Sequence, residues 1–332
     1  MCLRSSPFCF IYQTPEKMRR KIIKIFCILA VSFFAVSLLL SIYMVDFALS
    51  PGSNTTDLKT RMAQLGKTGE LGCWLDSLVG QNAFRDTFIM GYDSMKLHAY
   101  YARSAQSTAN TAIVIHGYGC NALNMLDLGH MFHHSLGYNI LLPDLRYSGK
   151  TGGDAFQMGW LDRKDIERWI SEAPAMFGDS VRLVIHGVSM GGATTMMTAG
   201  EQLPENVRCF IDDCGYTSVW DQFEKELNVV YKLPAFPILY MASTICSFRY
   251  GWNFKEASSV EQVRKCTRPM LFIHGGADDY VPTWMVHELY KAKPEPKELW
   301  IPEEAVHANS FNKYPKEYAE RVKSFTDKYM CK

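Results

Sequence analysis

The chain has 332 residues, which allows one large domain or two small ones, and 48% of its residues are hydrophobic while 21% are charged. The formal net charge of +1 gives no indication of a nucleic-acid partner. The charge is unevenly distributed, because residues 1–24 carry six Lys or Arg side chains and the single acid Glu16.

The basic head precedes an uncharged run of 21 residues, from Ile25 to Val45. A helix of that length covers roughly 30 Å, the thickness of the hydrocarbon core of a bilayer. Basic residues before the run and Asp46 after it favour a single-pass helix in the cell membrane, with a cytoplasmic N-terminus and an extracytoplasmic catalytic domain. A cleaved signal peptide is the alternative, but the run is longer than the usual apolar region of a signal and no Ala-x-Ala site follows it.

Beyond this run, helical and strand patterns divide the rest of the chain. Residues 57–78 favour a partly amphipathic helix, and residues 87–90 and 97–101 favour a hairpin. From there apolar strands alternate with helices, which predicts a mostly parallel sheet covered by helices on both faces. The expected strands span residues 111–116, 139–143, 181–185, 207–212, 270–274 and 298–301, and the expected helices residues 124–135, 161–173, 192–201, 284–292 and 318–329.

One interval breaks the alternation. Nearly sixty residues, rich in aromatic side chains and Met, separate the strand that ends at Asp212 from the strand that begins at Met270. A loop this long in a compact domain is either functional or structured. Helical spacing in residues 218–230 and 238–248 favours a helical lid at about residues 215–268, and two ordinary surface helices are the alternative.

The candidate nucleophile follows the strand at residues 181–185. There the sequence reads Gly187-Val188-Ser189-Met190-Gly191 and continues into a helical pattern. A strand, a sharp turn and a helix around Gly-x-Ser-x-Gly form the setting of a nucleophile elbow. The turn would place the Ser189 hydroxyl at a helix N-terminus, where backbone amides can stabilise a developing oxyanion.

A serine nucleophile needs a base and an acid that orients the base. The loops after two later strands contain suitable residues, Asp278 and His307, which lie 89 and 118 positions after Ser189. Since parallel strands bring these ends to one edge of the sheet, we expect the three side chains to converge. Asp279 is a rival for the acid, although it is better placed to cap the next helix. Asp212 and Asp213 are further alternatives.

The oxyanion hole requires two backbone amides. We expect one from Met190, directly after the nucleophile, and one from Tyr118 in the His-Gly loop that follows the strand at residues 111–116. No cofactor or metal is predicted. The histidines His130, His133 and His134 share a predicted helix without a matching carboxylate, and His186 and His274 sit at strand ends, where a structural role is more common.

Taken together, these motifs resemble the α/β-hydrolase superfamily, and within it the membrane-anchored bacterial serine hydrolases of the serine aminopeptidase-like and dienelactone hydrolase-like group. The resemblance covers roughly residues 85–330. The matching residues are His116-Gly117-Tyr118-Gly119, Pro143-Asp144-Leu145-Arg146, Gly187-Val188-Ser189-Met190-Gly191, His274-Gly275-Gly276-Ala277-Asp278 and His307. One departure is Arg146-Tyr147-Ser148-Gly149-Lys150, where relatives usually have Arg-Gly-His-Gly-x-Ser, in a loop expected to border the site.

The expected organisation is a basic cytoplasmic head (1–24), a transmembrane anchor (25–45), a juxtamembrane spacer (46–84) and an α/β-hydrolase domain (85–332). The expected activity is cleavage of carboxylic esters through an acyl-enzyme, on a small-molecule or lipid-like acyl substrate suited to an aromatic lid. A serine peptidase of the aminopeptidase type is the alternative. A membrane-tethered binding module without activity is a third hypothesis, against which the complete set of Ser, His and Asp argues.

Overall fold

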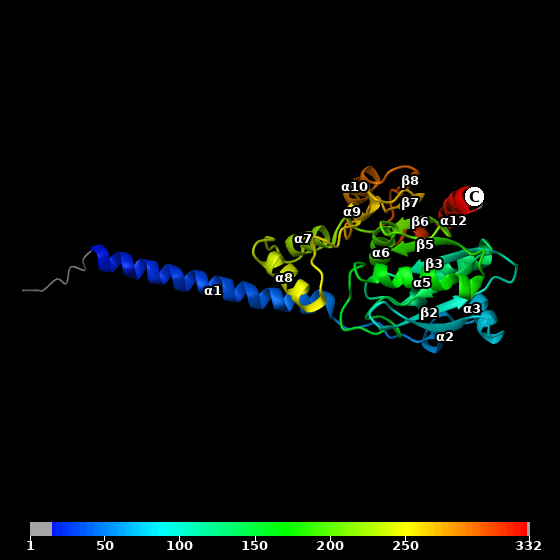
Figure 1. Ribbon diagram of the computed structural model, residues 1–332, viewed down its shortest axis with the longest axis horizontal. Coiled ribbons are helices and arrows are strands. Elements are labelled where there is room, and N and C mark those ends of the chain that lie inside the picture. Colours follow the sequence, from blue (N-terminus) through cyan, green and yellow to red (C-terminus); the bar gives the residue numbers. More distant parts are fainter. Residues whose placement is uncertain (1–14, 331–332) are drawn as a thin grey trace, which may run out of the picture.

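The computed structural model describes residues 15–330, and these are organised around one eight-stranded sheet (Figure 1). The strand order is β1-β2-β4-β3-β5-β6-β7-β8. Only β2 runs opposite to the direction of the other strands, so the sheet is mostly parallel, as predicted. The strands are β1 (Arg85–Met90), β2 (Lys96–Ala102), β3 (Asn110–Ile115), β4 (Asn139–Pro143), β5 (Arg182–Val188), β6 (Val207–Asp213), β7 (Met270–Ile273) and β8 (Lys297–Trp300).

Helices cover both faces of the sheet, which gives the protein two hydrophobic cores. Successive side chains of a strand point to opposite faces. In β3, Ile113 and Ile115 therefore join one core while Ala112 and Val114 join the other. The first core also receives α5 (Asp162–Phe177), α6 (Met190–Ala199), α9 (Ser259–Val263) and α10 (Trp284–Ala292), and the second receives α3 (Glu70–Gly80), α4 (Leu126–His130) and α12 (Pro315–Met330).

Two predicted helices are interrupted. The region expected to be one helix over residues 124–135 is a 3₁₀ turn η1 (Ala122–Met125), the short α4 and a π turn η2 (Met131–Ser135). The region expected to be helical over residues 57–78 forms α2 (Leu58–Leu65) and α3, separated by a turn at Gly66, whose positive φ of 67° ends α2. A short helix α11 (Ser310–Lys313) precedes α12.

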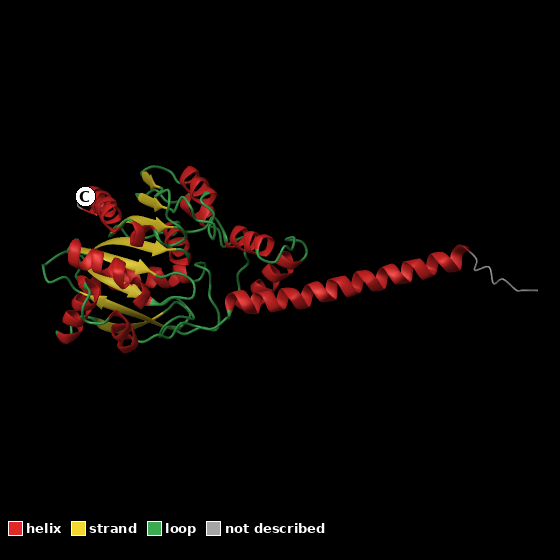
Figure 2. Cartoon of the chain, turned by 180° about the vertical axis from the view of Figure 1, so that it is seen from behind, coloured by secondary structure: helices red, strands yellow, loops and turns green. Residues whose placement is uncertain are grey.

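Helix α1 (Pro15–Leu49) projects from the domain as one continuous rod (Figure 2). It begins inside the expected basic head and continues four residues beyond Val45. It is long and apolar enough to span a membrane, and only 11% of its most apolar stretch is buried.

Within the described residues, the buried positions of α1 all fall in its C-terminal part, from Ser37 to Leu49. The segment between β6 and β7, residues 215–268 and hereafter the insertion, contains α7 (Val219–Val229) and α8 (Ile238–Tyr250), close to the expected helical ranges. Helix α8 packs against the C-terminal part of α1, on the side of the domain from which α1 leaves (Figure 1).

Candidate active site

Ser189 lies at the sharp turn between β5 and α6. Its φ of 58° and ψ of −118° lie in a strained region for a residue with a side chain. The turn depends on two glycines, because an added Cβ would lie 1.9 Å from the Gly191 carbonyl oxygen at Gly187 and 2.2 Å from the Ile115 carbonyl oxygen at Gly191. The backbone of Ser189 is fixed by its amide, which donates to the Asp213 carbonyl at 2.7 Å. The local structure therefore has the strand–turn–helix geometry that a nucleophile elbow requires, and this turn at Ser189 is hereafter the elbow.

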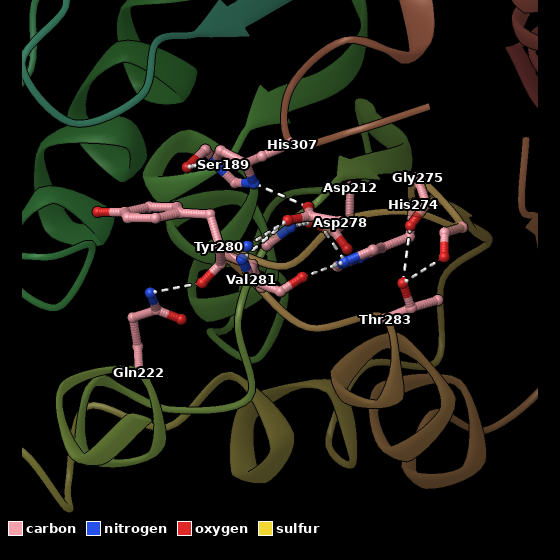
Figure 3. A network of polar contacts seen from close by, with 12 residues as sticks. Ser189, Asp212, Gln222, His274, Gly275, Asp278, Tyr280, Val281, Thr283 and His307 are labelled. Atoms are coloured by element: carbon pink, nitrogen blue, oxygen red, sulfur yellow. Dashed lines mark hydrogen bonds and ion pairs between the residues drawn. The ribbon is translucent and has the colours of Figure 1, made fainter. Parts of the chain in front are cut away.

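His307 and Asp278 converge on Ser189 from the loops after β8 and β7 (Figure 3). The distance from Ser189 Oγ to His307 Nε2 is 2.9 Å, and that from His307 Nδ1 to Asp278 Oδ2 is 2.8 Å. With Nδ1–H donating to the carboxylate, Nε2 is free to accept the serine proton. The arrangement can generate a serine nucleophile.

The carboxylate of Asp278 is held in a fixed orientation. Its other oxygen, Oδ1, accepts the amides of Tyr280 and Val281 at 3.0 and 2.9 Å. His274 Nε2 donates to the Val281 carbonyl at 2.8 Å, and the same atom lies 3.4 Å from Asp278 Oδ2 (Figure 3). His274 is thus a hydrogen-bonded support for the acid, in keeping with its expected structural role.

The rival acids lie elsewhere. Asp279 is exposed, and the expectation that it caps the next helix is wrong, because α10 begins after Thr283. Asp212 and Asp213 are buried beneath the elbow, where the side chain of Asp212 accepts the Gly215 amide and that of Asp213 accepts the Tyr318 hydroxyl.

Burial perturbs the acids beneath the elbow. It raises the pKa of Asp213 to about 7, against a lowering effect of its hydrogen bond from Tyr318, and it raises the pKa of Asp212 well above its usual range. The same Tyr318 oxygen lies 2.8 Å from His186 Nε2, and burial lowers the pKa of His186 to about 3. His186 is therefore a neutral, hydrogen-bonded residue of the core.

The loop after β3 lies directly against Ser189. A Cβ added at Gly117 would be 3.4 Å from Ser189 Cβ and 3.9 Å from its Oγ. His116 fixes this loop: the Leu145 amide donates to Nε2 at 2.9 Å, so Nδ1 carries the proton and donates to the Gly117 carbonyl at 2.8 Å. The loop therefore brings the backbone of Tyr118 near Ser189, where an oxyanion donor is expected.

The loop at residues 146–150, where the sequence departs from that of relatives, reaches the site through an intervening aromatic residue. Tyr147, with a positive φ of 61°, packs its ring edge-on against Phe156, and Phe156 contacts the ring of Tyr118 at 4.4 Å between centroids. Arg146 is buried and pairs with Asp165 through two nitrogens at 2.6 and 2.8 Å. Residues 146–150 are thus anchored by a buried ion pair, and Tyr147 reaches Tyr118, in the loop after β3, through the ring of Phe156.

Ser189 opens into an apolar cavity of about 360 Å³, within the range of small-molecule sites. Its walls come from the turn at Ser189, the loop after β3, the insertion, the loop after β7 and the end of α1. The lining residues include Tyr118, Met158, Met190, Tyr216, Phe223, Glu226, Leu227, Leu239, Ala242, Tyr280 and, from α1, Met44, Val45, Phe47 and Ala48.

Sequence reasoning missed two features of this region. It treated the apolar run before Asp46 as an anchor only, yet the last turns of α1 form part of the cavity wall, and Tyr118 donates its hydroxyl to the Ala48 carbonyl at 2.8 Å. It also missed Tyr280, whose ring lies 4.9 Å from that of His307. The contact of α1 could not be predicted, because an apolar run long enough to span a membrane has no hydrophobic periodicity that indicates which of its residues will contact a domain.

A third missed feature lies away from the cavity. The histidine cluster does have a carboxylate, Glu70 of α3, and ligand atoms of Glu70, His130 and His134 lie within 4.8 Å of one another. The sequence could not show this, because 60 residues separate Glu70 from His130.

Known proteins share both sequence and fold with this chain. The model of the prolyl oligopeptidase family matches residues 127–332. The chain is 33% identical to YqkD of Bacillus subtilis (strain 168) over 237 residues, 71% of this chain and 76% of YqkD. It is 27% identical to YfhR of Escherichia coli (strain K12) over 248 residues, 70% of this chain and 77% of YfhR. Both relatives are uncharacterized proteins.

Solved structures show the same fold at lower identity. The esterase Pf2001 of Pyrococcus furiosus aligns with a TM-score of 0.60 and 22% identity, over 74% of this chain and 93% of the esterase. The acylaminoacyl peptidase of Pyrococcus horikoshii aligns with a TM-score of 0.56 and 17% identity, over 77% of this chain and 44% of the peptidase. The protein is a serine hydrolase of the α/β-hydrolase fold. Within that class, it belongs to the prolyl oligopeptidase family.

Proposed function

We propose that this protein is a membrane-anchored carboxylic-ester hydrolase with Ser189 as nucleophile, His307 as general base and acid, and Asp278 as the residue that orients the imidazole. The observation that carries the proposal is the hydrogen-bonded chain from Ser189 Oγ through His307 to Asp278, with distances of 2.9 and 2.8 Å, at the wall of an apolar cavity. Helix α1 is the anchor, and the insertion is the lid that covers the cavity.

The reaction follows from this geometry. Ser189 Oγ attacks the ester carbonyl carbon as its proton moves to His307 Nε2, and the amides of Met190 and Tyr118 stabilise the oxyanion. The carbon–oxygen bond to the alcohol then breaks, and the alcohol leaves with the proton from His307. Water, deprotonated by His307, attacks the acyl-enzyme, and the carboxylic acid is released as the proton returns to Ser189.

The cavity favours esters over amino-terminal peptides. A peptidase that recognises a free amino terminus needs an unpaired carboxylate, and among the described lining residues Glu226 is the one acid. Its Oε1 accepts Lys225 Nζ at 2.8 Å, so its charge is already balanced. Cleavage of aminoacyl amides remains the second candidate, supported by the family to which the chain belongs.

A fluorophosphonate probe tests the nucleophile. It should label the wild type and the surface control Ser53→Ala, whereas Ser189→Ala should lose labelling and at least about 10⁴-fold of its turnover. Labelling of Ser189→Ala would refute the assignment. A series of p-nitrophenyl esters compared with aminoacyl p-nitroanilides then separates the two candidate activities, since faster cleavage of the anilides would favour the peptidase.

A further inference from the structure

The apolar run of α1 is only just long enough to cross a bilayer. A spanning helix needs about 20 residues, and the run from Ile25 to Val45 has 21. Residues 25–36 alone form about 18 Å of helix, little more than half of a hydrocarbon core of about 30 Å. Lys21 and Lys24 limit extension in the other direction. If α1 spans the membrane, residues 37–45 must therefore lie within the hydrocarbon.

This immersed stretch is the part of α1 that packs against the insertion. The buried residues of α1 recur every four positions and form one stripe, which consists of Ser37, Ser41, Val45 and Leu49. Ser41 Oγ donates to the Ile238 carbonyl at the start of α8, at 3.0 Å. At the other end of α8, Arg249 pairs with Asp46. With α1 across the bilayer, the start of α8 thus lies as deep in the hydrocarbon as Ser41, and the end of α8 lies at the membrane surface beside Asp46.

The surface of the insertion suits that position. Outside α1, half of the large hydrophobic side chains that are exposed in the described chain fall between residues 229 and 248. They are Val229, Val230, Tyr231, Phe236, Tyr240 and Phe248, hereafter the apolar tip, and the exposed fraction reaches 63% at Phe236 and 88% at Phe248. Exposed apolar patches of this kind mark interaction sites.

The charges and backbone of this segment also fit a lipid environment. Between Glu226 and Arg249, Lys232 is the one charged residue, and a lysine stem is long enough to bring its ammonium to the surface. In the turn between α7 and α8, Pro234 and Pro237 have no amide proton, and the amides of Lys232 and Leu233 donate to carbonyls of α7. Few backbone donors are thereby left to be satisfied by water.

The cavity connects this membrane-facing region to the nucleophile. Met44, Val45, Phe47 and Ala48 of α1 form one wall, and Val230, Tyr231, Ile238, Leu239 and Ala242 of the insertion form the facing wall, while Ser189 and Met190 line the same space. We infer that the apolar tip is embedded in the leaflet beside Asp46 and that the cavity takes the acyl chain of a bilayer glycerolipid, whose ester reaches Ser189 from the membrane between α1 and the insertion. This inference rests on the proposed ester hydrolase activity and on α1 as the anchor.

Hydrolysis in vesicles tests the route of the substrate. The full chain is reconstituted in vesicles of ether-linked phosphatidylcholine that contain dioleoylglycerol or dioleoylphosphatidylglycerol, and released oleate is compared with hydrolysis of soluble p-nitrophenyl butyrate. Phe236→Glu and Phe248→Glu, whose side chains do not line the cavity, should lower oleate release at least about tenfold, because a carboxylate is excluded from hydrocarbon. Both variants should cleave the soluble ester as the wild type does.

A matched control is Trp284→Glu, since Trp284 is a large exposed hydrophobic residue (51%) of α10, a helix that lies away from α1 (Figure 1). It should change neither activity. Cleavage of the soluble ester without release of oleate from either lipid by the wild type would overturn the inference while leaving the ester hydrolase proposal intact. Loss of both activities in Ser189→Ala, together with selective loss of oleate release in Phe236→Glu and Phe248→Glu, supports both proposals, and oleate release at the wild-type rate in the two Phe variants would overturn the membrane route.

A second measurement does not depend on turnover. The Ser189→Ala protein is reconstituted with a phosphatidylcholine whose acyl chain carries a diazirine, irradiated and digested. Labelled peptides should include residues 227–248 together with residues 44–48. Labelling confined to residues 25–43, or crosslinks from residues 227–248 to a second copy of the chain, would overturn the inference.

Discussion

At the scale of single residues, the elbow lies on a layer of buried acids whose ionisation is costly. The backbone carbonyl of Asp213 accepts the Ser189 amide, while its side chain accepts the Tyr318 hydroxyl at 2.9 Å. Burial raises the pKa of Asp213 from 3.8 to about 7. The same residue therefore holds the backbone of Ser189 through its main chain and makes stability depend on pH through its side chain.

We expect Asp213→Asn to change the pH profile of stability. The folded protein keeps the Asp213 proton up to about pH 7, whereas the unfolded chain releases it near 3.8, so folding binds a proton between these values. The stability of the wild type should thus fall relative to Asp213→Asn as pH rises from about 4 to 7, and the difference should stay constant at higher pH. Each tenfold difference in proton affinity is about 1.4 kcal/mol, so the change in Tm should reach several degrees.

Thermal unfolding from pH 4 to 8 measures this effect. The exposed Asp179→Asn is the control and should follow the wild type. Asp212, whose pKa is also raised, remains in the variant, so part of the slope should persist. Parallel Tm curves for wild type and Asp213→Asn would contradict the argument.

At the scale of elements, the active site depends on how closely β5 and α6 approach each other. The approach is closest at Gly187, where an added Cβ would lie 1.9 Å from the Gly191 carbonyl oxygen and 2.6 Å from Thr195 Oγ1. A backbone carbonyl in the first turn of a buried helix cannot move away without displacing Ser189.

We therefore expect Gly187→Ala to lower the free energy of unfolding by at least about 1–3 kcal/mol and to abolish fluorophosphonate labelling. The control is Gly80→Ala at the end of α3, where nothing lies within 4 Å of the added Cβ. That substitution should be neutral or stabilise the protein by about 0.4–1 kcal/mol. Chemical denaturation of both variants measures the two effects, and a Gly187→Ala protein of normal stability and labelling would show that the elbow tolerates a wider turn.

At the scale of the whole molecule, α1 connects two functions that the sequence presents as separate. Its basic N-terminal end and the acid at position 46 favour the orientation that we propose, and its last turns form part of the cavity wall. The orientation that we propose places residues 46–332 outside the cytoplasm.

Protease accessibility tests this orientation. A protease added to intact cells should degrade the domain after Asp46 and leave an epitope tag at the N-terminus protected. Lysed cells, in which both parts become accessible, are the control. Complete protection of the domain in intact cells would reverse the orientation.

Much of the fold and the main candidate site residues could be predicted from the sequence. The hydrophobic patterns of strands and helices are local, and the convergence of the site residues follows from the parallel arrangement of the strands. Apolar strands alternating with helices indicate a parallel sheet, and a parallel sheet brings the ends of its strands to one edge. Ser189, Asp278 and His307 could therefore be placed together despite separations of 89 and 118 residues. The choice of Asp278 over Asp279, Asp212 and Asp213 depended on position after the strand, and the hydrogen bond of Asp278 to His307 agrees with it.

The tertiary structure alone decided what surrounds that site. Glu70 meets the histidine cluster, α8 packs on α1, and Ala48 accepts the Tyr118 hydroxyl through contacts between segments that share no sequence pattern. Local periodicity reports which face of an element is apolar, but it does not report which partner covers that face. The sequence thus determined the fold class, the expected chemistry and a helix able to span a membrane, whereas only the packing of the chain decided that the end of this helix forms a wall of the cavity at Ser189.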